Sequence, residues 1–252
     1  MIPYRDENET QRLAIVTAAI IIMNIASWLV VQGAGADFPL ARSVCDLGLI
    51  PGELTGLLPP GRGFRMGPGA VCLTDPGRQV SHLVTSMFLH GGWMHLIGNM
   101  WFLWIFGNNV EDSMGRLRFV GFYLLTGLAA ALGQVVANPD SIVPMVGASG
   151  AISGIMGAYL VLYPRVKVYA LVPIFIFFTS IALPAWVMLG YWFVIQVVSG
   201  LYSSSDMGGV AFWAHIGGFV AGVVLIKLFA REKYIQAHRA NRWRPQRVWR
   251  AH

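Results

Sequence analysis

The sequence contains few charged residues and few cysteines. Only 12% of its 252 residues are Asp, Glu, Lys or Arg, about half of the roughly 25% found in an average soluble domain. Together with 56% hydrophobic residues and a mean hydropathy of +0.59, this composition excludes a disordered chain and argues against a soluble globular domain. Two cysteines are too few for a disulfide scaffold. The class that remains is a polytopic membrane protein with one compact helical domain.

Carboxylates are missing where a membrane enzyme or transporter would often need them. No Asp or Glu occurs between Ser141 and Ser205, and no histidine is followed by glutamate. A membrane aspartyl protease needs two buried aspartates, and a zinc protease needs His-Glu-x-x-His. A proton-coupled transporter usually has an intramembrane carboxylate. The sequence therefore disfavours these three classes, and we expect neither a metal nor another cofactor.

Six apolar stretches are long enough to predict membrane-crossing helices. They are residues 13–31, 93–106, 117–136, 149–163, 184–200 and 212–230. Residues 168–182 are also apolar, but Pro173 interrupts them and Pro184 bounds them. We therefore expect an interfacial or re-entrant piece there. The predicted fold is all-α, a bundle of six transmembrane helices. The first stretch is too long, and the residues before it too acidic, for a cleaved signal peptide.

The basic residues are distributed unevenly along this predicted bundle. Thirteen of the 18 Lys and Arg fall at the termini and in the loops of one side, and four fall in the loops of the other side. The positive-inside rule then places both termini in the cytoplasm. The compact chain and the lack of a targeting extension lead us to expect a bacterial inner membrane.

This topology divides the chain into three parts. Residues 1–12 form a cytoplasmic segment, residues 13–230 form the membrane domain with a long outer loop at 33–92, and residues 231–252 form a basic cytoplasmic tail. The tail directly follows an apolar helix and carries two tryptophans, so we expect it to face anionic lipid rather than nucleic acid. The outer loop holds Cys45 and Cys72, whose separation permits a disulfide in an oxidising compartment but does not require one.

Four polar residues lie near the outer ends of the second, fourth and sixth stretches. His95 and Asn99 are spaced i, i+4, Ser149 opens the fourth stretch, and His215 lies four residues into the sixth. Alternate spans begin on the same side of the membrane, so all four are expected at one end of the bundle. Polar groups in membrane helices are rare and usually functional. His90, five residues before His95, is nearer the surface, and we expect it to order the loop.

These residue types fit acyl transfer. Gly147 and Gly150 leave the Ser149 hydroxyl accessible, and the free N–H groups of a helix start provide half of an oxyanion hole. A histidine within about 3 Å can act as the base, and His95 and Asn99 are suitable oxyanion donors. The other interpretation is structural: a glycine-serine packing face, a histidine bonded to a carbonyl group, and polar contacts between helices.

A stripe of small residues accompanies the candidate base. Gly218 and Gly222 follow His215 on the same predicted helix at a spacing of four residues. Small residues at this spacing allow two membrane helices to approach closely. We therefore expect the sixth helix to pack tightly enough for the imidazole to reach the serine.

Four segments together resemble the rhomboid family of intramembrane serine proteases. They are HGGWMHLIGNM at 90–100, EDSMGRLR at 111–118, GASG at 147–150, and AHIGG at 214–218 followed by Gly222. The last two motifs are short, but the four occur in the family's order and on the expected spans. The resemblance covers residues 82–230 and does not extend to the first 80 residues or to the basic tail.

The resemblance implies a metal-independent protease that cleaves transmembrane protein substrates near their outer ends, within the lipid bilayer. It implies that Ser149 is the nucleophile and His215 the base. Asn99 and His95 are similar to the family's oxyanion-stabilising side chains. Glu111 and Arg118 resemble a structural motif on the cytoplasmic side.

The sequence departs from the family at two places. Ser81-His82 stand where many members have Trp-Arg, which affects how the outer loop sits at the interface. Ser153 stands where some members have an aromatic ring that stacks on the base, so another group must orient His215.

One alternative to a protease is a catalytically inactive rhomboid-like binder of transmembrane clients, although both Ser149 and His215 are present. Another is a solute channel or transporter. Such a protein needs a polar path to the inner side of the membrane, and the apolar run at 100–104 argues against one.

Overall fold

The computed structural model describes residues 1–67, 70–174, 177–203 and 209–236, and this part of the chain is mostly helical. Its helices are α1 (Ile15–Ala26), α2 (Asp37–Leu47), α3 (Pro51–Thr55), α4 (His82–Thr85), α5 (Trp93–Phe102), α6 (Asn108–Met114), α7 (Arg116–Ala137), α8 (Ser149–Leu162), α9 (Ala185–Tyr202) and α10 (Phe212–Phe229). Its strands are β1 (Ile2–Asp6), β2 (Gly63–Gly67), β3 (Ala70–Leu73), β4 (Lys167–Ile174) and β5 (Phe177–Pro184). π-Helical segments extend α1 over Ser27–Val31 and join α5 to α6 over Leu103–Gly107.

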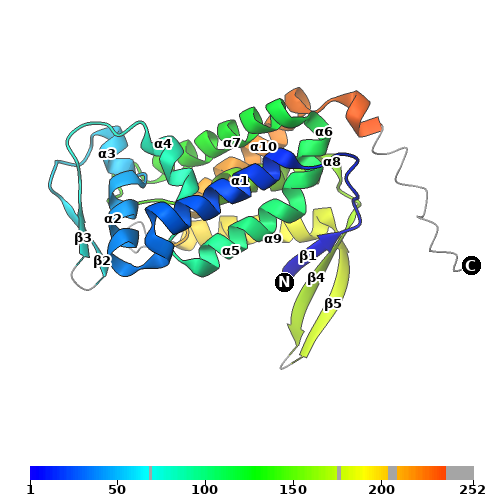
Figure 1. Ribbon diagram of the computed structural model, residues 1–252, viewed down its shortest axis with the longest axis horizontal. Coiled ribbons are helices and arrows are strands. Elements are labelled where there is room, and N and C mark those ends of the chain that lie inside the picture. Colours follow the sequence, from blue (N-terminus) through cyan, green and yellow to red (C-terminus); the bar gives the residue numbers. More distant parts are fainter. Residues whose placement is uncertain (68–69, 175–176, 204–208, 237–252) are drawn as a thin grey trace, which may run out of the picture.

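The predicted apolar stretches correspond to the long helices of a bundle (Figure 1). By length and composition, α7, α9 and α10 can each cross a membrane, whereas α8 and α1 with its π-helical extension are shorter apolar helices. The structure thus supports a helical membrane protein. That six helices cross the membrane stays a prediction.

Helix α8 forms the centre of the bundle. Its residues are buried continuously from Gly150 to Tyr159, and it contacts α5, α7, α9 and α10. Small residues explain this position, because a helix with glycine and alanine on several faces can be approached closely from each side. The outer surfaces of α9 and α10 carry exposed large apolar side chains, which is expected of helices that face lipid.

The fold is mostly helical, as the sequence predicted, but it is not purely α-helical, because the chain also forms two small sheets. Strands β1, β4 and β5 form an antiparallel sheet in that order, with Ile2 opposite Leu171 and Lys167 opposite Pro184. Strands β2 and β3 form a separate antiparallel pair. Figure 1 shows the three-stranded sheet projecting sideways from the end of the bundle opposite β2 and β3.

The apolar piece at 168–182 therefore forms most of the β4–β5 hairpin rather than a re-entrant segment. It is rich in valine, isoleucine and phenylalanine, which favour extended backbone, and Pro173 prevents a continuous helix. The N-terminal segment supplies the third strand, so residues 1–12 are structured in part. Of the basic tail, residues 231–236 are described and the rest lies outside the described residues.

The outer loop is folded onto the bundle. A disulfide joins Cys45 of α2 to Cys72 of β3, so the pairing that the sequence left open is present. The bond cross-links α2 to β3, which otherwise touch only through noncovalent contacts. It fixes the β2–β3 pair beside α2 at the end of the bundle where α8 begins.

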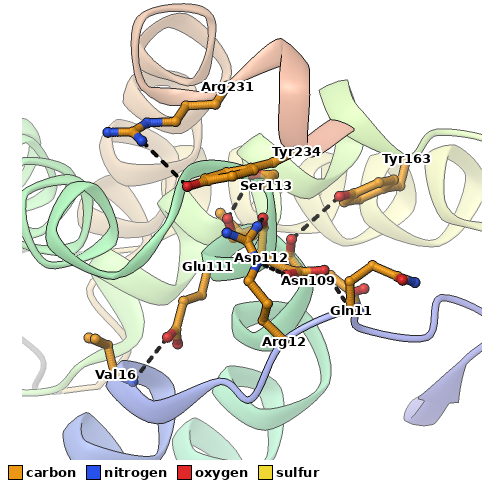
Figure 2. Close-up of polar contacts among 11 residues, drawn as sticks. Gln11, Arg12, Val16, Asn109, Glu111, Asp112, Ser113, Tyr163, Arg231 and Tyr234 are labelled. Carbon is orange, nitrogen blue, oxygen red and sulfur yellow. Dashed lines mark hydrogen bonds and ion pairs between the residues drawn. The ribbon is translucent and has the colours of Figure 1, made fainter. Parts of the chain in front are cut away.

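At the other end of the bundle, Glu111 of α6 caps α1 (Figure 2). Helix α1 has no side-chain cap of its own. The Glu111 carboxylate accepts the backbone N–H groups of Val16 and Thr17 at 3.1 and 2.8 Å and the Thr17 hydroxyl at 2.8 Å. Arg118 of the same motif donates to the Phe229 carbonyl oxygen at 3.0 Å. These bonds tie α6 and α7 to α1 and α10, which is a structural role.

Replacing Glu111 by alanine should destabilise the protein. The change leaves three donors at the start of α1 without their acceptor, and we expect a loss of about 2–4 kcal/mol in the free energy of unfolding. The matched control is Glu232→Ala, because Glu232 is exposed and bonds only Gln236 among the described residues. Unfolding of both variants in mixed micelles measures the difference. Equal stability of the two variants would contradict this account of Glu111.

Candidate active site

The structure brings Ser149 and His215 into contact. Ser149 is the first residue of α8, and His215 is the fourth residue of α10. The His215 Nε2 atom lies 2.8 Å from the Ser149 Oγ atom, and both side chains are half-buried. A serine hydroxyl bonded to an imidazole is the basic arrangement of nucleophilic catalysis by hydrolases.

Glycines in α8 and α10 permit this contact. A Cβ atom on Gly218 would overlap the Gly150 carbonyl oxygen, and one on Gly222 would overlap the Gly154 carbonyl oxygen. A Cβ on Gly150 would lie 2.6 Å from the Ala130 Cβ atom on α7, closer than two carbon atoms can approach without contact strain. The backbones of α8 and α10 therefore touch along the stripe that the sequence predicted. This contact places the imidazole over the start of α8.

Gln196 orients the imidazole from the opposite side. Its Oε1 atom lies 2.8 Å from the His215 Nδ1 atom. An amide oxygen can only accept a hydrogen bond, so the Nδ1 atom carries the proton and the Nε2 lone pair faces the serine hydroxyl. This is the tautomer that a general base needs. Trp192, one turn earlier on α9, lies with its ring 5.8 Å from the His215 ring.

Gln196 and Trp192 were not predicted from the sequence. A signal for Gln196 was available, because it is the one strongly polar residue in the apolar run of α9 and such residues are usually functional. Ser153, at the position of the family's aromatic ring, instead donates to the Ser149 carbonyl oxygen at 2.6 Å. The orientation of His215 therefore depends on α9 rather than on α8.

His95 also faces the serine. A Cβ atom added to Gly147 would lie 2.8 Å from the His95 Nε2 atom and 3.4 Å from the Ser149 Oγ atom. Gly147 has a φ of 129°, a conformation that favours glycine, so this residue fits the space between the two side chains. The Gly91 N–H group donates to the His95 Nδ1 atom at 3.2 Å. The neutral ring consequently presents an Nε2–H donor toward the serine.

Asn99 lies one helical turn below His95 and is buried. Its amide donates to the His95 carbonyl oxygen at 2.9 Å, and the residue does not line the cavity around Ser149. An amide has a second N–H group, which this bond leaves available. The structure thus places His95 at the serine and Asn99 behind it, and the expected oxyanion role of Asn99 stays a prediction.

His90 is buried beside His95, with the two ring centroids 5.2 Å apart. Burial is the main cause that lowers the pKa of His90 to about 3, and the neighbouring His95 ring acts in the same direction. Its backbone is held by both ends of the Gln32 amide at 2.8 Å. A neutral ring and an anchored backbone fit the expected role in ordering the loop.

A cavity of about 860 Å³ surrounds the serine. Ser149, His215 and His95 line it, together with Val44 of α2 and Phe64 of β2. The disulfide therefore fixes one wall of the cavity. A largely apolar cavity with a few convergent polar groups is typical of a binding site. In the described ranges, no group of three or more His, Cys, Asp or Glu side chains is arranged to hold a metal ion.

Known proteins share the part of the chain that carries this site. The family model described as the Rhomboid domain matches residues 77–232. Rhomboid-like protease 5 of Toxoplasma gondii is 34% identical over 151 residues, which cover 58% of this chain and 16% of that protein. Rhomboid protease GluP of Bacillus subtilis is 35% identical over 145 residues, which cover 57% and 25% of the two chains.

Another relative, Rhomboid-like protein 11 of Arabidopsis thaliana, described as chloroplastic, is 28% identical over 158 residues, covering 59% of this chain and 52% of that protein. The alignments thus span only about half, or less, of these relatives' lengths. The relatives include proteins described as chloroplastic and mitochondrial. The expectation of a bacterial inner membrane accordingly finds no support in them.

The close contact between α8 and α10 makes Gly218→Ala a direct test of the site's packing. The added methyl group must displace the Gly150 carbonyl oxygen, and we expect a loss of about 1–3 kcal/mol in the free energy of unfolding. Gly190→Ala on α9 is the matched control, because a Cβ there meets no atom within 4 Å. Thermal unfolding in detergent should show a lower midpoint for Gly218→Ala alone. Equal midpoints would mean that α8 and α10 are not in backbone contact.

Proposed function

Because the chain belongs to the rhomboid family, we propose that it is an intramembrane serine endopeptidase. It hydrolyses peptide bonds in or near the transmembrane helices of membrane-protein substrates, through a Ser149–His215 dyad and an acyl-enzyme. The observation that carries this proposal is the 2.8 Å contact between the His215 Nε2 and Ser149 Oγ atoms in a cavity large enough for a peptide segment. The family and the apolar helices make the chain an integral membrane protein.

The dyad accounts for both halves of the reaction. The Ser149 Oγ atom attacks the scissile carbonyl carbon while its proton passes to the His215 Nε2 atom. The Gln196 amide oxygen holds the Nδ1 proton and stabilises the imidazolium ion that forms. The imidazolium then gives its Nε2 proton to the leaving amine, and the C–N bond breaks. The same Nε2 atom then takes a proton from a water molecule that attacks the acyl carbon. It returns that proton to the Ser149 Oγ atom as the ester C–O bond breaks and the acid product leaves.

Negative charge develops on the carbonyl oxygen during both attacks. The backbone N–H group of Ser149 lies at the start of α8, where helical N–H groups have no partner within the helix. The His95 Nε2–H group faces the same space, and we expect the second N–H of Asn99 to join it when substrate binds. One such donor contributes about 2.7–4 kcal/mol in hydrolases. Gly147 leaves the room that the oxyanion needs.

The substrate is expected to be a transmembrane helix whose outer end unwinds into the cavity. A helical peptide bond is shielded from attack, so local unwinding must precede cleavage. In this proposal, six helices cross the membrane with both termini in the cytoplasm, and the serine lies below the outer surface. A catalytically inactive rhomboid-like binder is the second candidate. The bonded serine and histidine favour the protease, because a binder has no need of either.

Replacement of Ser149 by alanine should abolish cleavage of a transmembrane reporter in proteoliposomes. The nucleophile is lost, whereas a hydroxyl-to-hydrogen change at a half-buried position leaves the fold intact. Thermal unfolding of the variant serves as the control for folding. Undiminished cleavage by a folded Ser149→Ala protein would contradict the proposal, and absence of cleavage by the wild type on all reporters would favour the binder.

Gln196 should act as a positioning residue for the base. Gln196→Leu removes the acceptor for the His215 Nδ1 proton and leaves a buried donor unsatisfied, at a cost of about 1–3 kcal/mol. We expect kcat to fall about 5- to 150-fold with a smaller change in KM. Gln196→Glu keeps an acceptor at the same place and should retain most of the activity.

The pH dependence of kcat separates this role from a merely structural one. The Glu variant adds a negative charge beside the imidazole and should move the pH profile, whereas a residue that only packs would leave the profile in place. Equal losses in the Leu and Glu variants, with unchanged pH profiles, would contradict the positioning role.

A further inference from the structure

A second cavity lies at the end of the bundle opposite Ser149. Its volume is about 430 Å³, and it lies between the start of α1, the α6–α7 junction and the segment after α10. Four arginines line it: Arg12, Arg116, Arg118 and Arg231. Figure 2 shows that Arg12 and Arg231 meet at Tyr234, whose hydroxyl accepts Arg231 at 3.4 Å. The Arg12 guanidinium carbon lies 3.7 Å from the centre of the Tyr234 ring.

The two carboxylates beside this cavity are already engaged. Glu111 accepts the donors at the start of α1, as described above. Asp112 accepts the Gln11 N–H group and the Arg12 Nε–H group, both at 2.8 Å. Among the described residues, Arg12 is the only one of the four arginines in an ion pair. The cavity therefore retains an excess of positive charge.

The cavity wall also includes the start of a long membrane helix. Helix α7 begins at Arg116, has no acidic residue in its first turn, and has no side-chain cap at its N-terminus. Its first N–H groups and its dipole add to the positive potential produced by the arginines. Neither feature would be expected at a site evolved to bind a cation.

Apolar side chains flank the arginines. Leu13 and Leu117 both line the cavity and are 81% and 89% exposed. Since Arg116 begins a membrane-length helix and Phe229 ends another, this cavity lies at the level where lipid headgroups meet acyl chains. A soluble anion would gain nothing from these leucines, whereas the acyl chains of a lipid would cover them.

We propose that this arginine-lined cavity binds the phosphate group of an anionic phospholipid. Arg116 and Arg118 contact the phosphate together with the first N–H groups of α7, and Arg231 and Arg12 close the opposite side. The acyl chains run along Leu13 and Leu117 into the bilayer. The bound lipid bridges α1, α7 and the segment after α10, so it stabilises the end of the bundle that holds no disulfide among the described residues.

Native mass spectrometry of the full chain tests this proposal. The detergent-solubilised protein is mixed with equal amounts of dioleoylphosphatidylglycerol and dioleoylphosphatidylcholine, and the retained lipids are counted. We expect the wild type to retain phosphatidylglycerol preferentially. Arg116→Gln should lower this preference about five-fold, and the Arg116→Gln, Arg118→Gln double variant should lower it further by a similar factor.

Arg165→Gln is the matched control, because Arg165 is an exposed arginine at the same end of the bundle and does not line the cavity. Within the part of the chain that the structure describes, the Arg116 side chain forms no hydrogen bond or ion pair, so its single variant decides the outcome even if the double variant does not fold. A wild type without lipid preference would overturn the proposal. So would an unchanged preference in Arg116→Gln, or an equal loss in Arg165→Gln.

A final arm distinguishes lipid from free phosphate. Excess inorganic phosphate is added to the complex with phosphatidylglycerol. Retention of the lipid supports the proposal, because the acyl chains contribute to binding. Complete displacement would show that the site takes a soluble phosphate and would overturn the assignment of a lipid. None of these readouts depends on proteolysis, so the experiment tests lipid binding independently of the proposed protease activity.

Discussion

Helices α8 and α10 approach so closely that side chains larger than hydrogen would collide with the facing backbone at Gly218 and Gly222. The position of His215 over Ser149 follows from this contact, because the two residues lie at the same end of the two touching helices. In lipid, packing rather than the hydrophobic effect holds helices together. The site therefore depends on glycine at these positions. Because glycine has no Cβ atom, the backbones of α8 and α10 can touch, and this close approach brings the Ser149 hydroxyl and the His215 imidazole into contact.

The imidazole needs a second constraint, since contact with Ser149 alone does not decide which ring nitrogen carries the proton. Gln196 provides it through a neutral amide rather than a carboxylate. A carboxylate would bind the imidazolium more strongly, but a charged group is costly to bury among apolar helices. An amide oxygen fixes the same tautomer at a lower desolvation cost. The lack of acidic residues from 142 to 204 is consistent with this arrangement.

The sequence was sufficient to predict what depends on local signals. Helix positions follow from the length of apolar runs, and Ser149 and His215 stand out because polar residues are rare in such runs. The contribution of Gln196 depends on how α9 is rotated against α10, which no local pattern records. The β4–β5 hairpin was missed because a short apolar run interrupted by Pro173 is compatible with several structures. Asn99 lies one turn from His95, as its i, i+4 spacing requires, but its bond to the His95 carbonyl oxygen is a choice of rotamer that the sequence does not reveal.

The central claim is that the imidazole makes the Ser149 hydroxyl nucleophilic. The most direct measurement is covalent labelling of the detergent-solubilised full chain by a fluorophosphonate, with the adduct located by peptide mass spectrometry. The account predicts an adduct on Ser149 that disappears in a folded His215→Ala variant. A wild-type protein that is not labelled at Ser149, or a His215→Ala protein that is labelled equally well, would contradict it.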